Sequence, residues 1–274
     1  MFEAAVDAVI SGDLATLETL LRQDPTLVRA RSSRPHGATL LHYVAANGVE
    51  DERQKTPPNI VAITKLLLQA GAEVDAEANL YGGGAKTLGL LVSSVHPHRA
   101  GLQVALVDVL VDAGATLDGA LLTALEFVYP AAADALVRRG AKVDTLLTAA
   151  GLGRLDLVER FLDGGAAKAE LEHAFILACR LDRVEVADRL LRHGVDPSAR
   201  DKQGFTGLHW AAWYGYMTTL ERLLERHAPL EIKNEYGGTV LGTVVWAAAN
   251  ADTGVDYAPV IERLIRAGAM RSPQ

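Results

Sequence analysis

The stretch that decides the fold of this chain is T-G-L-H-W-A-A-W-Y-G at residues 206–215. A second copy, T-L-L-H-Y-V-A-A-N-G, occurs much earlier at residues 39–48. Each copy is followed by an amphipathic stretch that ends in a leucine pair, at 223–224 and at 67–68. Such self-similarity is the signature of a repeat protein, in which each helical unit buries its apolar face against its neighbours.

Both copies resemble ankyrin repeats, whose consensus runs T-P-L-H-x-A-A-x-x-G and continues into a second helix and G-A-x-V/P. The similarity is close in repeats two, six and seven and degenerate in repeats three, four and five. Long insertions in repeats two and three, with the Y-G-G-G finger at 81–84, look like those of a bacterial subgroup. The resemblance implies an all-α solenoid that binds partners on its concave face.

Apolar pairs that mark the ends of the second helices recur along the whole chain. They fall at 20–21, 67–68, 110–111, 136–137, 161–162, 190–191, 223–224 and 264–265, with spacings from 25 to 47 residues. The sequence therefore predicts one domain over 1–274 with about eight helix-turn-helix repeats. The approximate repeats are 1–34, 35–82, 83–116, 117–142, 143–169, 170–201, 202–235 and 236–274.

The uneven spacings predict where the repeats depart from the regular pattern. After Gly114, Gly140 and Gly165 the next helix begins within a few residues, so the hairpin fingers of repeats four to six are expected to be short or missing. The insertions at 49–59 and 96–103 are expected as neighbouring loops between the two helices of repeats two and three. Loops of this length on a scaffold are common sites of function.

Composition narrows the class of protein. The 274 residues carry 27 basic and 34 acidic side chains, a formal net charge of −7, which argues against a general nucleic-acid binder. Cys179 is the only cysteine, so no disulfide framework or cysteine-built zinc site can form. No apolar stretch is long enough to span a bilayer, and the first residues lack the basic start of a signal peptide. We expect a soluble cytoplasmic protein without a cofactor.

The candidate ligand-binding residues occupy the variable positions of the repeat consensus, which the resemblance places on the concave face. Three tryptophans fall there in adjacent repeats, and exposed tryptophan and tyrosine are typical of binding hot spots. The alternative is that these tryptophans pack on one another and only close the C-terminal repeats. The candidates are Tyr43, Asn47, Glu126, Phe127, Arg180, Trp210, Trp213, Tyr214 and Trp246.

Other chemistry-bearing residues have structural interpretations. His42 and His209 fill the histidine of the T-P-L-H frame, and the resemblance gives that histidine a role in fixing the turn into the first helix. Cys179 replaces a close-packed alanine, which predicts a buried, inert thiol. His96 and His98, facing Glu50 and its acidic neighbours, could form a metal or acid/base site, but the motif fixes no third ligand, and surface charge pairing is the competing interpretation.

The sequence thus indicates a non-enzymatic binding module that holds a protein or peptide in the concave groove through the C-terminal aromatic residues. The alternative hypothesis is a small-molecule-binding protein or an enzyme that uses the open central groove or the His96 and Glu50 insertions. No catalytic or metal-binding residue is assigned, and no nucleic-acid or membrane partner is expected. The pattern names no particular partner and does not fix the oligomeric state.

Overall fold

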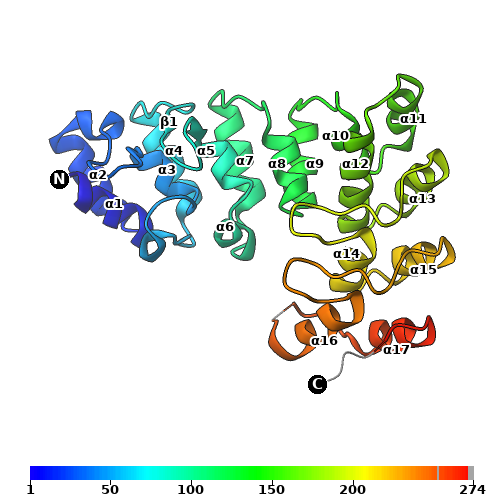
Figure 1. The fold of residues 1–274 in the computed structure, drawn as a ribbon. Coiled ribbons are helices and arrows are strands. Elements are labelled where there is room, and N and C mark those ends of the chain that lie inside the picture. Colours follow the sequence, from blue (N-terminus) through cyan, green and yellow to red (C-terminus); the bar gives the residue numbers. More distant parts are fainter. Residues whose placement is uncertain (252, 271–274) are drawn as a thin grey trace. The chain divides into compact units, whose positions relative to one another are not determined.

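The computed structural model describes residues 1–251 and 253–270. The chain consists of two compact units, unit 1 (Met1–Lys142) and unit 2 (Val143–Gln274). In each unit the helices follow one another in pairs, as Figure 1 shows.

Unit 1 contains helix pairs whose first members form one row and whose second members form another. In the first row α1 packs on α3, α3 on α5 and α5 on α8, while α2, α4, α7 and α9 form the second row. The pairs are α1 (Phe2–Ser11) with α2 (Leu14–Gln23), α3 (Leu40–Val44) with α4 (Ile60–Gln69), α5 (Thr87–Leu91) with α7 (Gln103–Asp112), and α8 (Ala120–Glu126) with α9 (Pro130–Arg138). The connections contain the 3-10 helices η1 (Pro25–Arg29) and η2 (Asp51–Arg53), helix α6 (Val95–Arg99), and strands β1 (Glu77–Ala78) and β2 (Ala85–Lys86).

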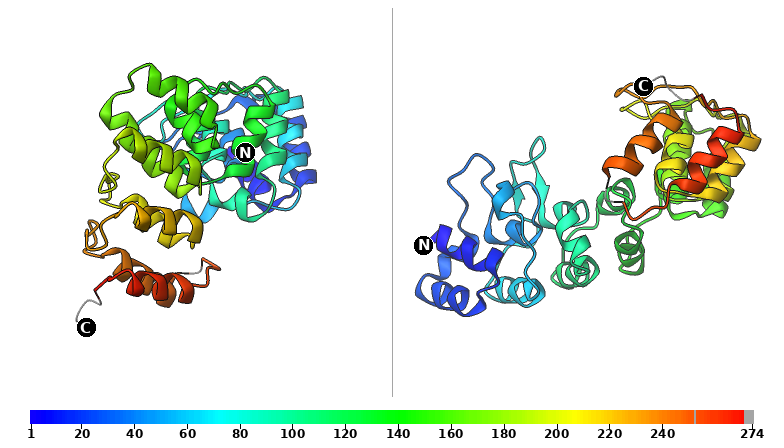
Figure 2. Two further views of the ribbon diagram at one scale, coloured as in Figure 1. Left: turned by 90° about the vertical axis from the view of Figure 1, so that its right-hand side faces the viewer. Right: turned by 90° about the horizontal axis from the view of Figure 1, so that it is seen from below.

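Unit 2 repeats the same arrangement, with the longest first-row helices at α12 and α16. Helices α10, α12, α14 and α16 pack in sequence as one row, and α11, α13 and α15 form the second row, which can be followed in the views of Figure 2. The pairs are α10 (Leu146–Leu152) with α11 (Leu155–Asp163), α12 (Lys168–Arg180) with α13 (Val184–His193), α14 (Gly207–Trp213) with α15 (Met217–Glu225), and α16 (Val240–Asn250) with α17 (Ala258–Arg266).

The fold class is all-α, as the sequence predicts. In the described residues the strands are confined to one short antiparallel pair, β1 and β2, in the finger between α4 and α5. The connections 113–119, 139–145 and 164–167 are short, in agreement with the reduced fingers expected there. The repeat boundaries and the single domain remain predictions, and the last four residues of the last repeat, 271–274, lie outside the described part.

Both long insertions lie between the two helices of a pair, but neither forms the open loop that we expected. The first contains η2, and the second contains helix α6 with His96 and His98. The expected pairing of the two insertions is wrong. The Glu50 carboxylate contacts Arg34 Nε at 2.5 Å and His36 Nε2 at 3.2 Å. The His98 ring stacks on Tyr129 with centroids 4.2 Å apart.

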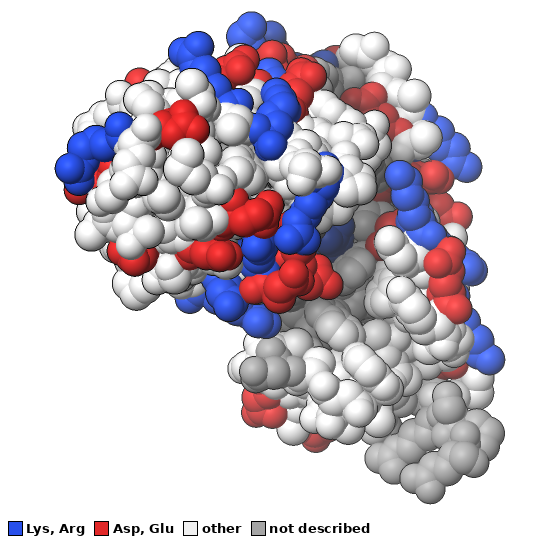
Figure 3. Space-filling view, turned by 90° about the vertical axis from the view of Figure 1, so that its left-hand side faces the viewer, with Lys and Arg blue, Asp and Glu red and all other residues white. Residues whose placement is uncertain are grey.

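An ionic network joins the first insertion to the N-terminal helix. The Arg53 guanidinium lies 2.6 Å from Glu3 and 3.4 Å from Asp7. Burial alone would raise the pKa of Glu50, but its hydrogen bonds with its own backbone N–H and His36, together with the charge of Arg34, outweigh burial and lower it. Figure 3 shows blue and red side chains side by side over this end of unit 1. The insertion is therefore fixed by charge pairing to its own unit.

A threonine and a histidine together start the helices that carry the repeat motif. At α14, Thr206 and His209 form a capping box, in which His209 Nδ1 accepts the Thr206 N–H at 3.2 Å. Nε2 must then carry the proton, and it donates to the Gly238 carbonyl at 3.3 Å. His42 makes the same contacts with Thr39 and the Ala85 carbonyl. Each histidine therefore joins its helix to the following finger, and the structural role expected for both is confirmed.

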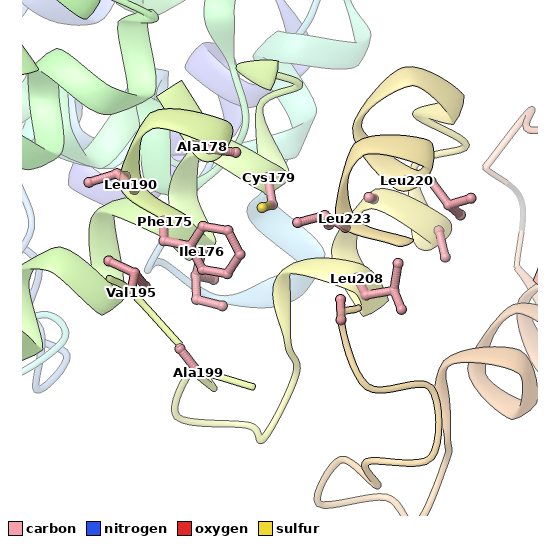
Figure 4. Packing of buried hydrophobic residues seen from close by; sticks show 14 of the residues in the cluster. Phe175, Ile176, Ala178, Cys179, Leu190, Val195, Ala199, Leu208, Leu220 and Leu223 are labelled. Carbon is pink, nitrogen blue, oxygen red and sulfur yellow. The ribbon is translucent and has the colours of Figure 1, made fainter. Parts of the chain in front are cut away.

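The core of unit 2 is built around α12. Phe175 and Cys179 are fully buried there, among the apolar side chains shown in Figure 4. Burial raises the pKa of the Cys179 thiol, which keeps it protonated and unreactive at neutral pH. The expectation of a buried cysteine is confirmed.

Gly207 is expected to be indispensable because α12 and α14 approach closely. A Cβ at this position would lie 2.7 Å from Cys179 Sγ and 3.1 Å from the Phe175 ring. We expect Gly207→Ala to lower the free energy of unfolding by about 1–3 kcal/mol, the usual cost of overpacking. Urea titration followed by circular dichroism measures this cost.

Two variants check the cause of this loss. Gly89 is also a helical glycine, but a Cβ there would meet nothing within 4 Å. Gly89→Ala should therefore be neutral or stabilising, since alanine favours a helix by up to about 1 kcal/mol over glycine. Adding Cys179→Ala to Gly207→Ala should recover part of the loss, and strictly additive effects of the two substitutions would contradict the proposed clash.

Candidate binding surfaces

The nine candidate residues divide between the two units. Four lie in unit 1: Tyr43, Asn47, Glu126 and Phe127. Five lie in unit 2: Arg180, Trp210, Trp213, Tyr214 and Trp246. The unit 1 candidates lie on α3 and α8 or just after them, and the unit 2 candidates lie on α12, α14 and α16 or directly after α14.

Trp213 and Trp246 form a stacked pair across two neighbouring helices of unit 2. Their ring centroids are 6.4 Å apart and their planes differ by 19°, with Trp213 at the end of α14 and Trp246 inside α16. Trp213 is half-buried, whereas Trp246 is 57% exposed and follows the exposed Val245. The pair thus presents an ordered, solvent-facing apolar patch.

Trp210 is held from several directions and is only partly accessible. Its ring stacks on Phe205 at 4.8 Å and on Tyr214 at 6.0 Å, and its Nε1–H donates to Asp201 at 2.8 Å. The Arg180 guanidinium lies over the same ring, 4.5 Å from the centroid, in a cation–π contact. The structure therefore brings Arg180, Trp210 and Tyr214 together, with much of the Trp210 ring committed to contacts within the protein.

The aromatic run continues to Tyr216, whose ring stacks on Tyr214 at 5.5 Å. Burial raises the pKa of both tyrosines, so both phenols stay neutral at physiological pH. Sequence reasoning included Tyr214 but missed Phe205 and Tyr216. Their positions on either side of the motif helix, in F-T-G-L-H-W-A-A-W-Y-G-Y, are the signal that could have indicated them.

Tyr43 is not exposed, contrary to the expectation that it lies open on the concave face. Its side chain is fully buried, with His36 edge-on at a centroid distance of 6.2 Å. Burial raises the pKa of its phenol. The reason is tertiary: the finger before α3 and the first insertion cover the position that the consensus leaves open.

Asn47 and Phe127 line a cavity of about 670 Å³ in unit 1, between the Y-G-G-G finger and helices α5 and α8. Asn47 donates to the Leu90 carbonyl and to Ser93, and it accepts a hydrogen bond from the Tyr81 hydroxyl at 2.6 Å. Phe127 is 52% exposed, and Glu126 is half-buried beside it at the end of α8. Here the structure joins candidates from different repeats into one concave site.

Sequence reasoning missed most of the residues around this cavity. Tyr81 and Lys86 come from the Y-G-G-G finger and Asp118 from the short connection between α7 and α8, rather than from the variable positions of the helices. The run of glycines after Tyr81 was the available signal. Tyr81, Gly82, Gly83 and Gly84 all have positive φ, a conformation that glycine adopts without strain. The finger therefore turns sharply and places Tyr81 beside Asn47.

The insertions show no arrangement that would hold a metal ion. Among the described residues, no group of three or more His, Cys, Asp or Glu side chains is placed to bind one. His96 and His98 lie on the single turn of α6, and the His98 ring is engaged by Tyr129. Among the residues that the structure describes, no helix is both long and apolar enough to cross a membrane.

These features define an all-α repeat protein built from stacked helix pairs. Residues 146–234 match the family model for ankyrin repeats (3 copies). This range runs from α10 to just beyond α15, and so contains three helix pairs. The chain therefore contains ankyrin repeats, and the resemblance outside 146–234 remains a prediction. Ankyrin repeats generally mediate protein–protein interaction, which supports a binding scaffold.

Proposed function

We propose that unit 2 holds a protein or peptide partner on a surface formed by α14 and α16. We call it the aromatic surface and define it by Trp213, Tyr214, Val245 and Trp246. The observation that carries the proposal is the stack of Trp213 on Trp246, in which the Trp246 side chain is 57% exposed. Exposed tryptophans are the residues most enriched in binding hot spots. Because the two rings are already ordered, a partner loses little entropy in immobilising them.

The composition supports the class of partner and the compartment. The formal charge of −7 favours a protein over a nucleic acid, whose phosphates require a basic surface. The single cysteine is free and buried, which favours a reducing compartment such as the cytoplasm. Trp210 on α14 and Arg180 on the adjacent helix α12 support the aromatic surface, rather than acting as its exposed anchors.

Trp246→Ala tests the proposal with little risk to the fold. Since Trp246 is more than half exposed, we expect the free energy of unfolding to change by less than about 1 kcal/mol. The affinity for a partner captured from the source lysate and then purified should fall about 30-fold, the effect of losing a hot spot of about 2 kcal/mol. Tryptophan fluorescence measures the affinity directly, because Trp210, Trp213 and Trp246 all lie in unit 2.

Leu155→Ala is the matched control. Leu155 is also exposed, at 36%, but it lies on the second-row helix α11 of the same unit. This variant should bind as the wild type does. Equal affinity of wild type and Trp246→Ala for every captured partner would show that the aromatic surface is not the contact region.

A further inference from the structure

The cavity of unit 1 is a second site, separate from the aromatic surface and independent of the function proposed for it. Its volume of about 670 Å³ is in the range of ligand pockets. Its floor is made of small or helical residues, Gly89, Leu90 and Ala120, and its rim carries the rings of Tyr81 and Phe127. These two side chains are 77% and 52% exposed, so each offers an uncovered ring to a ligand.

The charges around the cavity favour a cationic occupant. Lys86 is the one basic residue in the lining, and its Nζ lies 3.7 Å from the Asp75 carboxylate and donates to Thr116 Oγ1 at 3.0 Å. Asp75 also accepts the Thr116 N–H. The positive charge is thus neutralised within the protein, which disfavours a phosphate or a carboxylate ligand.

Asp118 is the acidic residue of the lining, and it remains available. Its side chain is exposed, and it forms no ion pair within the part of the chain that the structure describes. The carboxylate therefore combines with two exposed aromatic rings in one concave site. An organic cation satisfies both features, because aromatic faces attract cations and a carboxylate accepts charge-assisted hydrogen bonds.

We propose that this cavity receives an arginine side chain of a partner peptide, with the guanidinium at Asp118 and its flat faces against Tyr81 and Phe127. A guanidinium suits the site better than an ammonium, because it is planar, stacks on aromatic rings and pairs with a carboxylate through two N–H groups. Ser93, Thr123 and Asn47 also line the cavity. Tyr81 is oriented for this role by its hydrogen bond to Asn47.

The test uses the full chain and a short end-capped peptide with one arginine between glycine and serine residues. Fluorescence anisotropy of the labelled peptide measures binding at low ionic strength. A second peptide carries citrulline, the neutral isostere of arginine. We expect the citrulline peptide and the Asp118→Asn variant each to bind about tenfold more weakly, because each removes one charge of the pair.

Two further variants separate the cavity from the surrounding surface. A Cβ on Gly89 meets nothing within 4 Å, so Gly89→Leu extends a side chain into the cavity and should abolish binding. Asp134→Asn removes an exposed acid from the second-row helix α9 of the same unit, and should leave binding unchanged. Circular dichroism checks that each variant is folded.

Distinct results would overturn the proposal. Equal binding of the arginine and citrulline peptides would exclude a cation site, even if Gly89→Leu blocks both. Unchanged affinity of the Asp118→Asn variant would exclude the proposed ion pair, because this substitution removes the charge with almost no change in side-chain size. Methylguanidinium is used as a competitor of the labelled peptide. If it binds as tightly as the peptide does, the cavity is assigned to a free small cation instead of a peptide.

Discussion

Replacing Phe175 by alanine is expected to lower the free energy of unfolding of unit 2 by about 3–5 kcal/mol. The ring is fully buried in the core cluster, and it lies against the start of α14, where a Cβ on Gly207 would be 3.1 Å away. Removing it leaves a cavity between α12 and α14. Neighbouring repeats stabilise each other through such interfaces, so the loss affects the stacking of both helix pairs.

Urea titration followed by tryptophan fluorescence measures this loss specifically, since all the tryptophans belong to unit 2. Tyr236→Ala is the control, because it also removes a large aromatic ring, but one that is 79% exposed. It should cost less than about 1 kcal/mol. Similar losses in the two variants would show that the core of unit 2 does not depend on Phe175.

The second large effect is expected at His209. His209→Ala removes the partners of the Thr206 N–H and the Gly238 carbonyl in a buried region. Leaving two buried backbone groups unsatisfied is expected to cost roughly 2–5 kcal/mol at neutral pH. The exposed His193, at the end of α13, is the control, and His193→Ala should change stability by less than about 0.5 kcal/mol.

The pH dependence identifies the cause of the His209 effect. Burial lowers the pKa of His209 below its ordinary value of 6.5, so the unfolded chain binds more protons than the folded one in the interval between the two values. The stability that His209 provides is therefore complete above pH 6.5 and is lost as the pH falls below it, by up to about 1.4 kcal/mol per pH unit. The variant should lack this slope when the unfolding of unit 2 is followed by tryptophan fluorescence, since the similarly buried His42 lies in unit 1. An equal slope in wild type and His209→Ala would rule out the buried neutral histidine as its source.

Local sequence patterns predicted the fold class because helix starts and helix pairs are encoded locally. The Thr39/His42 and Thr206/His209 frames set the helix starts through contacts three residues apart. The short stretches after Gly114, Gly140 and Gly165 left no room for fingers, and the structure has none there among the described residues. The burial of Cys179 followed from its place in the motif.

Exposure of the candidate residues was harder to predict, since it depends on segments far away in the chain. Tyr43 and Trp246 both occupy variable positions of the repeat consensus. Yet Tyr43 is fully buried, whereas Trp246 is 57% exposed. The difference comes from the finger and the insertion that fold over Tyr43. Insertions of irregular length break the repeat, so the consensus does not show what they cover.

The sequence by itself determined that this chain is a stack of helix pairs with ankyrin repeats, because stacking requires only the recurring apolar and capping residues. Only the tertiary structure decided which surfaces can bind. It committed much of the Trp210 ring to Phe205, Asp201 and Arg180 while leaving Trp246 exposed. It also joined Asn47, Tyr81, Asp118 and Phe127 around one cavity. Contacts among residues so far apart depend on how successive repeats stack, and no local pattern specifies that geometry.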